Sequence, residues 1–195
     1  MSAALVLALL AAPVGPARPA DDWRRLAKPA DRTRLRGWRS AWLDGLAAAR
    51  ASDSGAVLRE GALLDPDRAL ADPLPPPGSY RCRTLKLGSQ RAEVPGYAAL
   101  ASVACRVGTE NGPTFTELAG PQRRVGRLFA SDGARGYFLG ALLFGDEARP
   151  FGYGRDPGRN VAGYVERVGP ARWRLVVPRP RYDSLVDVIE LTLVS

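Results

Sequence analysis

Acid–base and nucleophilic chemistry in this chain must do without an imidazole, because its 195 residues include no histidine. Ser-His-Asp and Cys-His nucleophilic systems need an imidazole base, and catalytic zinc sites usually rely on histidine ligands. Those enzyme classes are excluded, and we expect neither a metal nor another cofactor. Carboxylates, arginines and two cysteines remain as the candidates for chemistry.

Carboxylates are the side chains that could still support hydrolysis. Asp146 and Glu147 follow Gly145 at the end of an apolar segment. The later acids are Asp156, Glu166, Asp183, Asp187 and Glu190. A glycoside hydrolase needs two carboxyls about 5–10 Å apart, and no spacing in the sequence singles out such a pair. Isolated acids in an arginine-rich chain are more often ion-paired or solvated, so a carboxylate-dependent hydrolase is the second hypothesis.

The glycine-rich stretch FGYGRDPGRN, residues 151–160, suggests a phosphate-binding loop. Such a loop leads into a helix N-terminus, which directs its backbone donors, and it ends in Gly-Lys-Ser/Thr. Here the following residues 160–178 alternate apolar and polar side chains around a Gly169-Pro170 turn, which predicts a β-hairpin. We therefore interpret the stretch as a surface loop with a turn at 156–158.

The two cysteines, Cys82 and Cys105, each lie in a predicted strand and lack the CxxC spacing of redox motifs. A chain of this length can bury a sufficient core without them. We expect a disulfide between them, formed in an oxidising compartment. The alternative is two free thiols, one of them made reactive by flanking arginines.

Helical periodicity dominates the first part of the chain. Residues 29–50 are predicted to form a helix, with Pro29 in the first turn and one apolar face. That face consists of Leu35, Trp38, Trp42 and Leu46. A second short helix is expected over 56–63, and Asp65-Pro66 is expected to open a further helical turn.

Strand periodicity follows the proline-rich connector of residues 73–78. The expected strands are 79–87, 97–107, 113–118, 122–129, 135–144, 160–168, 172–177 and 185–193. About eight strands with no helix between them predict a mainly β fold, α+β by content. We expect an antiparallel up-and-down β-barrel or strongly curled, calycin-like sheet, because closure removes exposed edges.

The expected strand Tyr137–Phe144 is apolar on both faces, which indicates that its outer face is also covered. The helix that carries Trp38 and Trp42 is the expected cover. We therefore predict a single domain over 21–195, with a helical part (21–72), the connector and a barrel part (79–195), and with the helices outside the barrel.

The N-terminus predicts export. Residues 3–14 form a short apolar run followed by small residues, which is typical of a signal peptide over 1–20, although no Lys or Arg precedes the run. The run is too short to span a bilayer, so we expect no transmembrane span. A buried N-terminal helix of a cytosolic protein is the alternative. Export predicts a periplasmic or secreted location.

The net charge of +8 comes almost entirely from arginine. A basic chain can bind nucleic acid or an anionic surface. The arginines here are scattered among Ala, Gly, Pro and Asp, without a dense basic run. We therefore expect no nucleic-acid partner.

Several long motifs occur in a characteristic order. They are YRCRTLKLG, ACRV, GPQRRVGRLF, GYFLGALLFGDE, YGRDPGRNVAGYVERVGPARWRLVVPRP and SLVDVIEL, preceded by PADRTRLRGWRSAWLDGLAAAR and EGALLDPD. With them the chain resembles an uncharacterised bacterial family, domain of unknown function 4893. The resemblance implies a small exported protein and no assigned reaction. Members of that family often carry Ser at position 121 and His-Phe-Glu at 181–183, where this chain has Pro and Arg-Tyr-Asp.

The leading functional hypothesis is a non-enzymatic periplasmic binding or interaction module, because a small barrel can hold one ligand or present loops to a partner. The candidate ligand-binding residues are Gln122, Arg123, Asp146, Glu147, Asp156 and Arg159. An ion-pair belt around the rim is the alternative for the same residues. A hydrolase of envelope glycans, or an inhibitor or assembly partner of an envelope protein, are the competing functions. A deep apolar mouth would support ligand binding, two facing acids would support the hydrolase, and a filled barrel with an exposed aromatic patch would support a partner protein.

Overall fold

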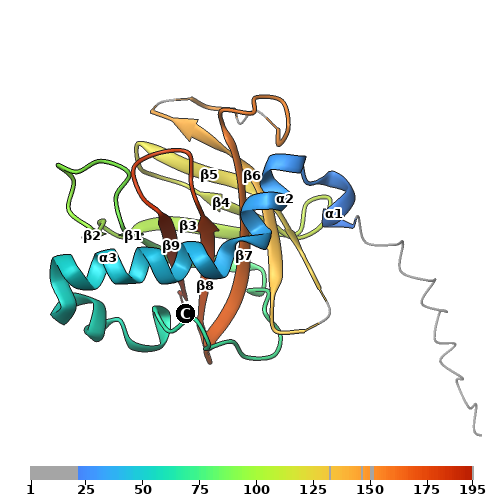
Figure 1. Cartoon of the computed structure of the whole chain (residues 1–195). Helices are drawn as coiled ribbons and strands as arrows, with labels where there is room; N and C mark the ends of the chain where they lie inside the picture. The colour runs from blue at the N-terminus through green and yellow to red at the C-terminus, as the bar shows by residue number, and fades with distance from the viewer. Residues whose placement is uncertain (1–21, 132, 146, 150–151, 195) are drawn as a thin grey trace, which may run out of the picture.

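A computed structural model shows a closed β-barrel with helices on its outside (Figure 1) and describes residues 22–131, 133–145, 147–149 and 152–194. The predicted leader and Asp146 lie outside the described residues. Within them, nine strands form one antiparallel sheet in the order β2-β1-β3-β4-β5-β6-β7-β8-β9. Strand β1 also pairs with β9, which closes eight of the strands into a barrel. The predicted antiparallel barrel is confirmed.

The strands are β1 (Gly78–Leu87), β2 (Tyr97–Ala99), β3 (Val103–Gly108), β4 (Thr114–Glu117), β5 (Gln122–Phe129), β6 (Gly136–Phe144), β7 (Asn160–Gly169), β8 (Arg172–Pro178) and β9 (Val186–Leu193). The helices are α1 (Trp23–Leu26), α2 (Pro29–Arg36), α3 (Trp38–Arg59) and the 3-10 helix η1 (Gly61–Leu63). None of the helices in the described part of the chain combines the length and apolarity needed to cross a membrane.

The expected strand over 97–107 is in fact two strands. Both β2 and β3 pair with the same side of β1, with Ala99 opposite Leu85 and Val103 opposite Cys82. From Ala99 to Val103 the chain advances four residues, whereas from Leu85 to Cys82 the partner strand β1 advances three. The chain therefore bulges between β2 and β3. The interruption leaves β2 at the end of the sheet order, with β1 as its one neighbour among the described strands.

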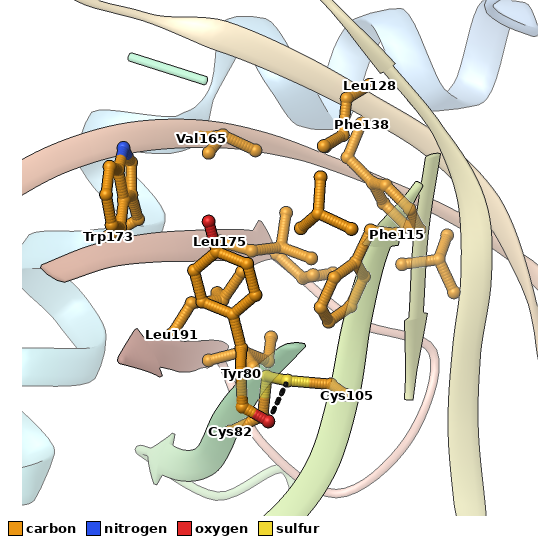
Figure 2. Packing of buried hydrophobic residues seen from close by; sticks show 14 of the residues in the cluster. Tyr80, Cys82, Cys105, Phe115, Leu128, Phe138, Val165, Trp173, Leu175 and Leu191 are labelled. Carbon is orange, nitrogen blue, oxygen red and sulfur yellow. Dashed lines mark hydrogen bonds between the residues drawn. A yellow bond between two sulfur atoms is a disulfide. The ribbon is translucent and has the colours of Figure 1, made fainter. Parts of the chain in front are cut away.

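Side chains fill the barrel interior, because alternate residues of every strand point inward. The interior cluster consists of Tyr80, Cys82, Cys105, Val107, Phe115, Leu128, Phe138, Leu142, Val161, Val165, Trp173, Leu175, Val177, Ile189 and Leu191. Figure 2 shows the rings of Phe115 and Phe138 meeting inside the wall, and their centroids lie 5.9 Å apart in an edge-to-face arrangement. A Cβ on Gly126 would lie 2.4 Å from the Cα of Gly140, so glycine is required where β5 and β6 approach closely.

A disulfide joins Cys82 of β1 to Cys105 of β3 inside the barrel, as predicted (Figure 2). The register sets Cys82 opposite Val103 and Cys105 opposite Tyr80, so the two cysteines are diagonal neighbours on one face of the sheet. Their Cα atoms lie 6.0 Å apart, within the range of ordinary disulfides.

The helical part differs from the expectation in its boundaries. Gly37 separates α2 from α3, which replace the single helix predicted over 29–50. The second predicted helix, 56–63, is the end of α3 followed by η1. Asp53 interrupts α3 with extended backbone angles, and its carboxylate accepts a hydrogen bond from the amide of Ala56, which restarts the helix. Asp65-Pro66 forms a turn rather than the start of a helix, since the Asp65 carboxylate accepts from the amide of Asp67.

The apolar face of α3 covers the outside of β1, β8 and β9 (Figure 1). Trp42 and Leu46 are buried there against Leu85, Val176 and Val188. The helices therefore lie outside the barrel, as predicted.

The cover of β6 comes from α1 and from the first part of the helix predicted over 29–50. Trp23 of α1 stacks on Tyr137 with ring centroids 3.9 Å apart. Ala27 and Leu35 pack on Leu139. The helix predicted over 29–50 therefore does cover β6 through Leu35, whereas its later residue Trp42 packs with Leu85, Val176 and Val188 of the neighbouring strands.

Candidate functional site

An arginine at one end of the barrel interior is buried between two carboxylates. Arg124 of β5 points inward and is 5% exposed. Its guanidinium donates to Glu117 of β4 at 3.1 Å and to Asp187 of β9 at 2.5 Å. Burial alone would lower the pKa of Arg124, but the charges of Glu117 and Asp187 outweigh that effect and raise it. The group is therefore a buried ion-pair network with one cation between two carboxylates, which we call the mouth cluster (Glu117, Arg124, Asp187), and Lys86 lies 3.7 Å from Asp187 as a further cation.

The loop between β8 and β9, residues 179–185, closes this end of the barrel. Gln90 donates to the carbonyls of Pro180 and Ser184 and holds the loop in place. The ring of Tyr182 packs edge-on against Phe144. The cavity left beneath the loop has a volume of about 20 Å³, which is room for about one water molecule. This end of the barrel is therefore not a deep apolar mouth of the kind that would hold a ligand.

Most of the predicted site residues do gather, outside the barrel wall beside the mouth. Arg159 bonds both carboxylate oxygens of Glu147, at 2.7 and 2.6 Å. It also lies 3.4 Å from a carboxylate oxygen of Asp156. Arg123 donates to the backbone carbonyls of Gly145 and Glu147. Gln122 lies apart from this group, at the wall of the mouth cavity.

These contacts are those of an ion-pair belt that ties the loop after β6 to the barrel. Hydrogen bonds from the Arg159 guanidinium, and then from the amide of Phe144, hold the pKa of Glu147 below its usual range. The carboxylate is consequently ionised and occupied at neutral pH. The arrangement ties the described part of this loop to the barrel, and the described residues of the belt offer no pair of groups with the opposed protonation states that acid–base catalysis uses.

The loop 152–159 has the turn geometry expected from its sequence. The amide of Gly158 donates to the side chain of Asp156, and the amide of Gly154 donates to the side chain of Asn160. The chain then enters β7 rather than a helix. The interpretation of this stretch as a loop, and not as a phosphate cradle, is confirmed.

The remaining predicted acids are all held by cations. Glu166 bonds Arg174 and Arg135, Glu190 bonds Arg83 and Arg172, and Asp183 lies near Lys86 and Arg91. Arg174 is fully buried on the outer face of β8, where it also donates to the carbonyls of Leu63, Asp65 and Arg68. These described acids therefore form ion pairs, and they do not form the pair of facing carboxyls that a glycoside hydrolase needs.

An open hollow lies on the outer face of β5 and β6, and we call it the outer groove. Its volume is about 440 Å³, within the usual range of small-molecule sites. Its lining residues are Leu26, Lys28, Val125, Gly126, Arg127, Phe129, Leu139, Gly152 and Tyr153. It lies between α1 on one side and the loop 152–153 on the other.

The floor of the outer groove is apolar because of the strand register. Val125, Arg127 and Phe129 alternate with the inward-facing residues of β5, and Leu139 of β6 lies opposite Arg127. The guanidinium of Arg127 lies 5.1 Å from the ring centre of Phe129. Leu26 at the rim is 40% exposed. The groove thus offers an aliphatic and aromatic floor with a cationic group above it.

The wall opposite β5 is fixed by Tyr153. Its hydroxyl accepts a hydrogen bond from the amide of Lys28 at 2.8 Å and donates to the buried carboxylate of Asp31, which also bonds Arg34. Burial, and then the bond to Asp31, raise the pKa of Tyr153, so it remains a neutral donor at physiological pH. Lys28 is exposed at the groove rim, which places a second cation there.

The outer groove contains none of the residues predicted from sequence. The alternation in QRRVGRLF, residues 122–129, could have indicated the apolar floor of the groove, because it places Val125 and Phe129 on the face opposite Leu128. That the helices leave this part of the face open depends on where α1 and α2 pack. The mouth cluster joins β4, β5 and β9, and no local pattern connects those positions.

A family model described as "Domain of unknown function (DUF4893)" matches residues 23–191 of the chain. The match covers both the helical part and the barrel, which confirms the resemblance of the ordered motifs. No curated protein matches the chain, and no solved structure matches it.

Proposed function

This chain belongs to the family of domain of unknown function 4893, and with that as premise we propose that it is an exported, non-enzymatic binding protein whose ligand occupies the outer groove. The observation that carries the proposal is the contrast between two places. The barrel interior is filled and its mouth cavity measures about 20 Å³, whereas the outer groove measures about 440 Å³ and is open.

Two features support export. The N-terminal apolar run has the composition of a signal peptide. The Cys82–Cys105 disulfide belongs to an oxidising compartment. Expression of the full chain followed by separation of periplasm from cytosol tests this part, since retention of an uncleaved chain in the cytosol would contradict it.

The ligand class follows from the chemistry of the lining. Val125, Phe129 and Leu139 would exclude water from an apolar chain, while Lys28, exposed at the rim, would favour an anionic group at its end. The proposed ligand is therefore an amphiphilic monoanion of the fatty-acid type, free or as part of a lipid.

The hydrolase hypothesis lacks a comparable support. Glu147, Glu166 and Asp187 are each bonded by arginine, so none of the three is free to approach a substrate, and the lowered pKa of Glu147 makes that carboxylate a poor general acid at neutral pH. The binding hypothesis needs no such group.

Titration calorimetry with dodecanoate below its micelle concentration tests the groove. We expect saturable one-to-one binding to the native chain and at least tenfold weaker binding to V125D, whose carboxylate would repel the ligand from the floor. The matched control is A104D, on the exposed outer face of β3 and outside the groove lining, which should bind as the native chain does.

Dodecyltrimethylammonium has the same tail and the opposite charge, and it should bind more weakly than dodecanoate. The Lys28→Glu variant should reduce or reverse the difference in affinity between dodecanoate and dodecyltrimethylammonium. Mass spectrometry of lipids retained by the purified protein distinguishes a free fatty acid from a phospholipid. The absence of dodecanoate binding, or equal affinities for the native chain and V125D, would refute the proposed site.

A further inference from the structure

Strand β2 leaves one open edge on an otherwise closed barrel. Strand β1 pairs with β2, β3 and β9, and the other seven described strands of the barrel each have two neighbours, whereas β2 has β1 alone. On the same side of β1, β3 has β4 as its outer neighbour, and the equivalent position beyond β2 would be filled if β4 were longer. The turn after Glu117 ends β4 before it reaches that level, so the sheet lacks a strand there.

The hydrogen-bond alternation shows which backbone groups face outward from this edge. Leu100 donates to the carbonyl of Thr84 at 2.9 Å, and Gly88 donates to the carbonyl of Gly96 at 2.7 Å. In an antiparallel pair such bonds recur at every second residue. The amide and carbonyl groups of Tyr97 and Ala99 therefore point away from β1, toward the side where the sheet ends.

The residues along the edge lack charges and prolines, two of the usual protections against pairing, although β2 is short and the chain bulges beside it. Natural edges are blunted by charges, prolines or bulges turned outward. The nine residues Gly96–Ala104 contain neither a charged residue nor a proline. Two exposed leucines flank the edge: Leu100, which directly follows β2, is 45% exposed, and Leu118, whose amide bonds the carbonyl of Ala104, is 53% exposed.

We propose that the free edge of β2 is a docking site for an extended apolar segment of a partner protein, which adds a strand beyond β2. Its backbone would pair with Tyr97 and Ala99, and its side chains would contact Leu100 and Leu118. A second copy of this chain is a poorer occupant. Two chains that each carry a charge of +8 repel each other, whereas an uncharged apolar segment meets no such repulsion.

Selection of a phage library of random twelve-residue peptides on the full chain supplies the probe. The enriched peptides are then titrated against the native chain and against A99P. Proline at 99 removes an amide that points away from β1 and leaves the β1–β2 bonds in place. The matched control A99V keeps that amide.

We expect enriched peptides rich in β-branched and aromatic residues. A99P should weaken their binding at least tenfold, while A99V should bind within about twofold of the native chain. Peptide binding should also slow hydrogen exchange of the Ala99 amide. L118D, which leaves the backbone of β2 unchanged, should weaken binding several-fold, and it provides a second reading if A99P is poorly folded.

Three outcomes would overturn the proposal. Selection could yield no peptide, or the peptides could bind A99P and L118D as tightly as the native chain. Light scattering could instead show a concentration-dependent dimer that A99P abolishes, which would assign the edge to a second copy. These outcomes are independent of dodecanoate binding, because the β2 edge and the outer groove share no residue.

Discussion

Replacing Arg124 by methionine should destabilise the protein strongly, because it would remove the cation that lies between two buried carboxylates and leave Lys86, 3.7 Å from Asp187, as the remaining cation. Glu117 and Asp187 are 3% and 4% exposed, and both are bonded to Arg124. Methionine is shorter than arginine but keeps the apolar stem of the side chain, so the lost charge dominates the effect. Breaking a buried ion pair in this way costs about 3–5 kcal/mol.

Urea unfolding followed by tryptophan fluorescence measures the loss, and calorimetry should show a fall in Tm of about 6–20 °C for a domain of this size. The triple variant R124M/E117Q/D187N removes the unpaired charges while keeping hydrogen-bonding groups. It should recover more than half of the lost stability. Dodecanoate binding should be unchanged in any variant that folds, since the mouth cluster lies outside the outer groove.

A loss below about 1 kcal/mol for R124M would contradict the reasoning, because it would mean that water reaches the carboxylates. A triple variant no more stable than R124M would also contradict it, since packing and not charge would then account for the loss.

Three further predictions concern the barrel itself. Replacing both Cys82 and Cys105 by alanine should lower the free energy of unfolding by about 3 kcal/mol, from a sequence separation of 23, and urea unfolding with and without reductant checks this. Burial raises the pKa of Tyr80 from 10.0 to about 12. The neutral hydroxyl should therefore contribute about 3 kcal/mol to the free energy of unfolding below pH 10, and this contribution should be lost as the pH rises through about 12. The difference in absorbance at 295 nm between the native chain and Tyr80→Phe in an alkaline titration measures the pKa of Tyr80. Gly126→Ala places a Cβ 2.4 Å from both the Cα of Gly140 and the carbonyl of Leu139 and should cost at least about 1–3 kcal/mol, whereas Gly37→Ala, whose nearest contact is 3.6 Å, should be almost neutral in the same unfolding assay.

The order and position of the strands could be predicted closely, because turn residues and alternation are local. The predicted ranges 122–129 and 172–177 correspond to β5 and β8. The split of 97–107 into β2 and β3 could not be predicted, since the bulge depends on a four-to-three mismatch with β1, a partner distant in sequence.

The candidate sites were less predictable than the strands. The cluster of Arg123, Glu147, Asp156 and Arg159 was identified because all four lie near strand ends in the sequence. Its role as an ion-pair belt, the neutralisation of Asp187 by Arg124, and the opening between α1 and β5 depend on which elements meet in space.

The sequence alone determined that this protein has no imidazole chemistry, that its strands are antiparallel and that its cysteines can pair, because composition and periodicity are properties of the chain itself. Only the tertiary structure decided that the barrel is filled, that its buried charges are paired, and that the outer groove and the edge of β2 lie open. The reason is physical: burial and charge pairing are set by residues from separate strands, and their distances exist only after the barrel has closed.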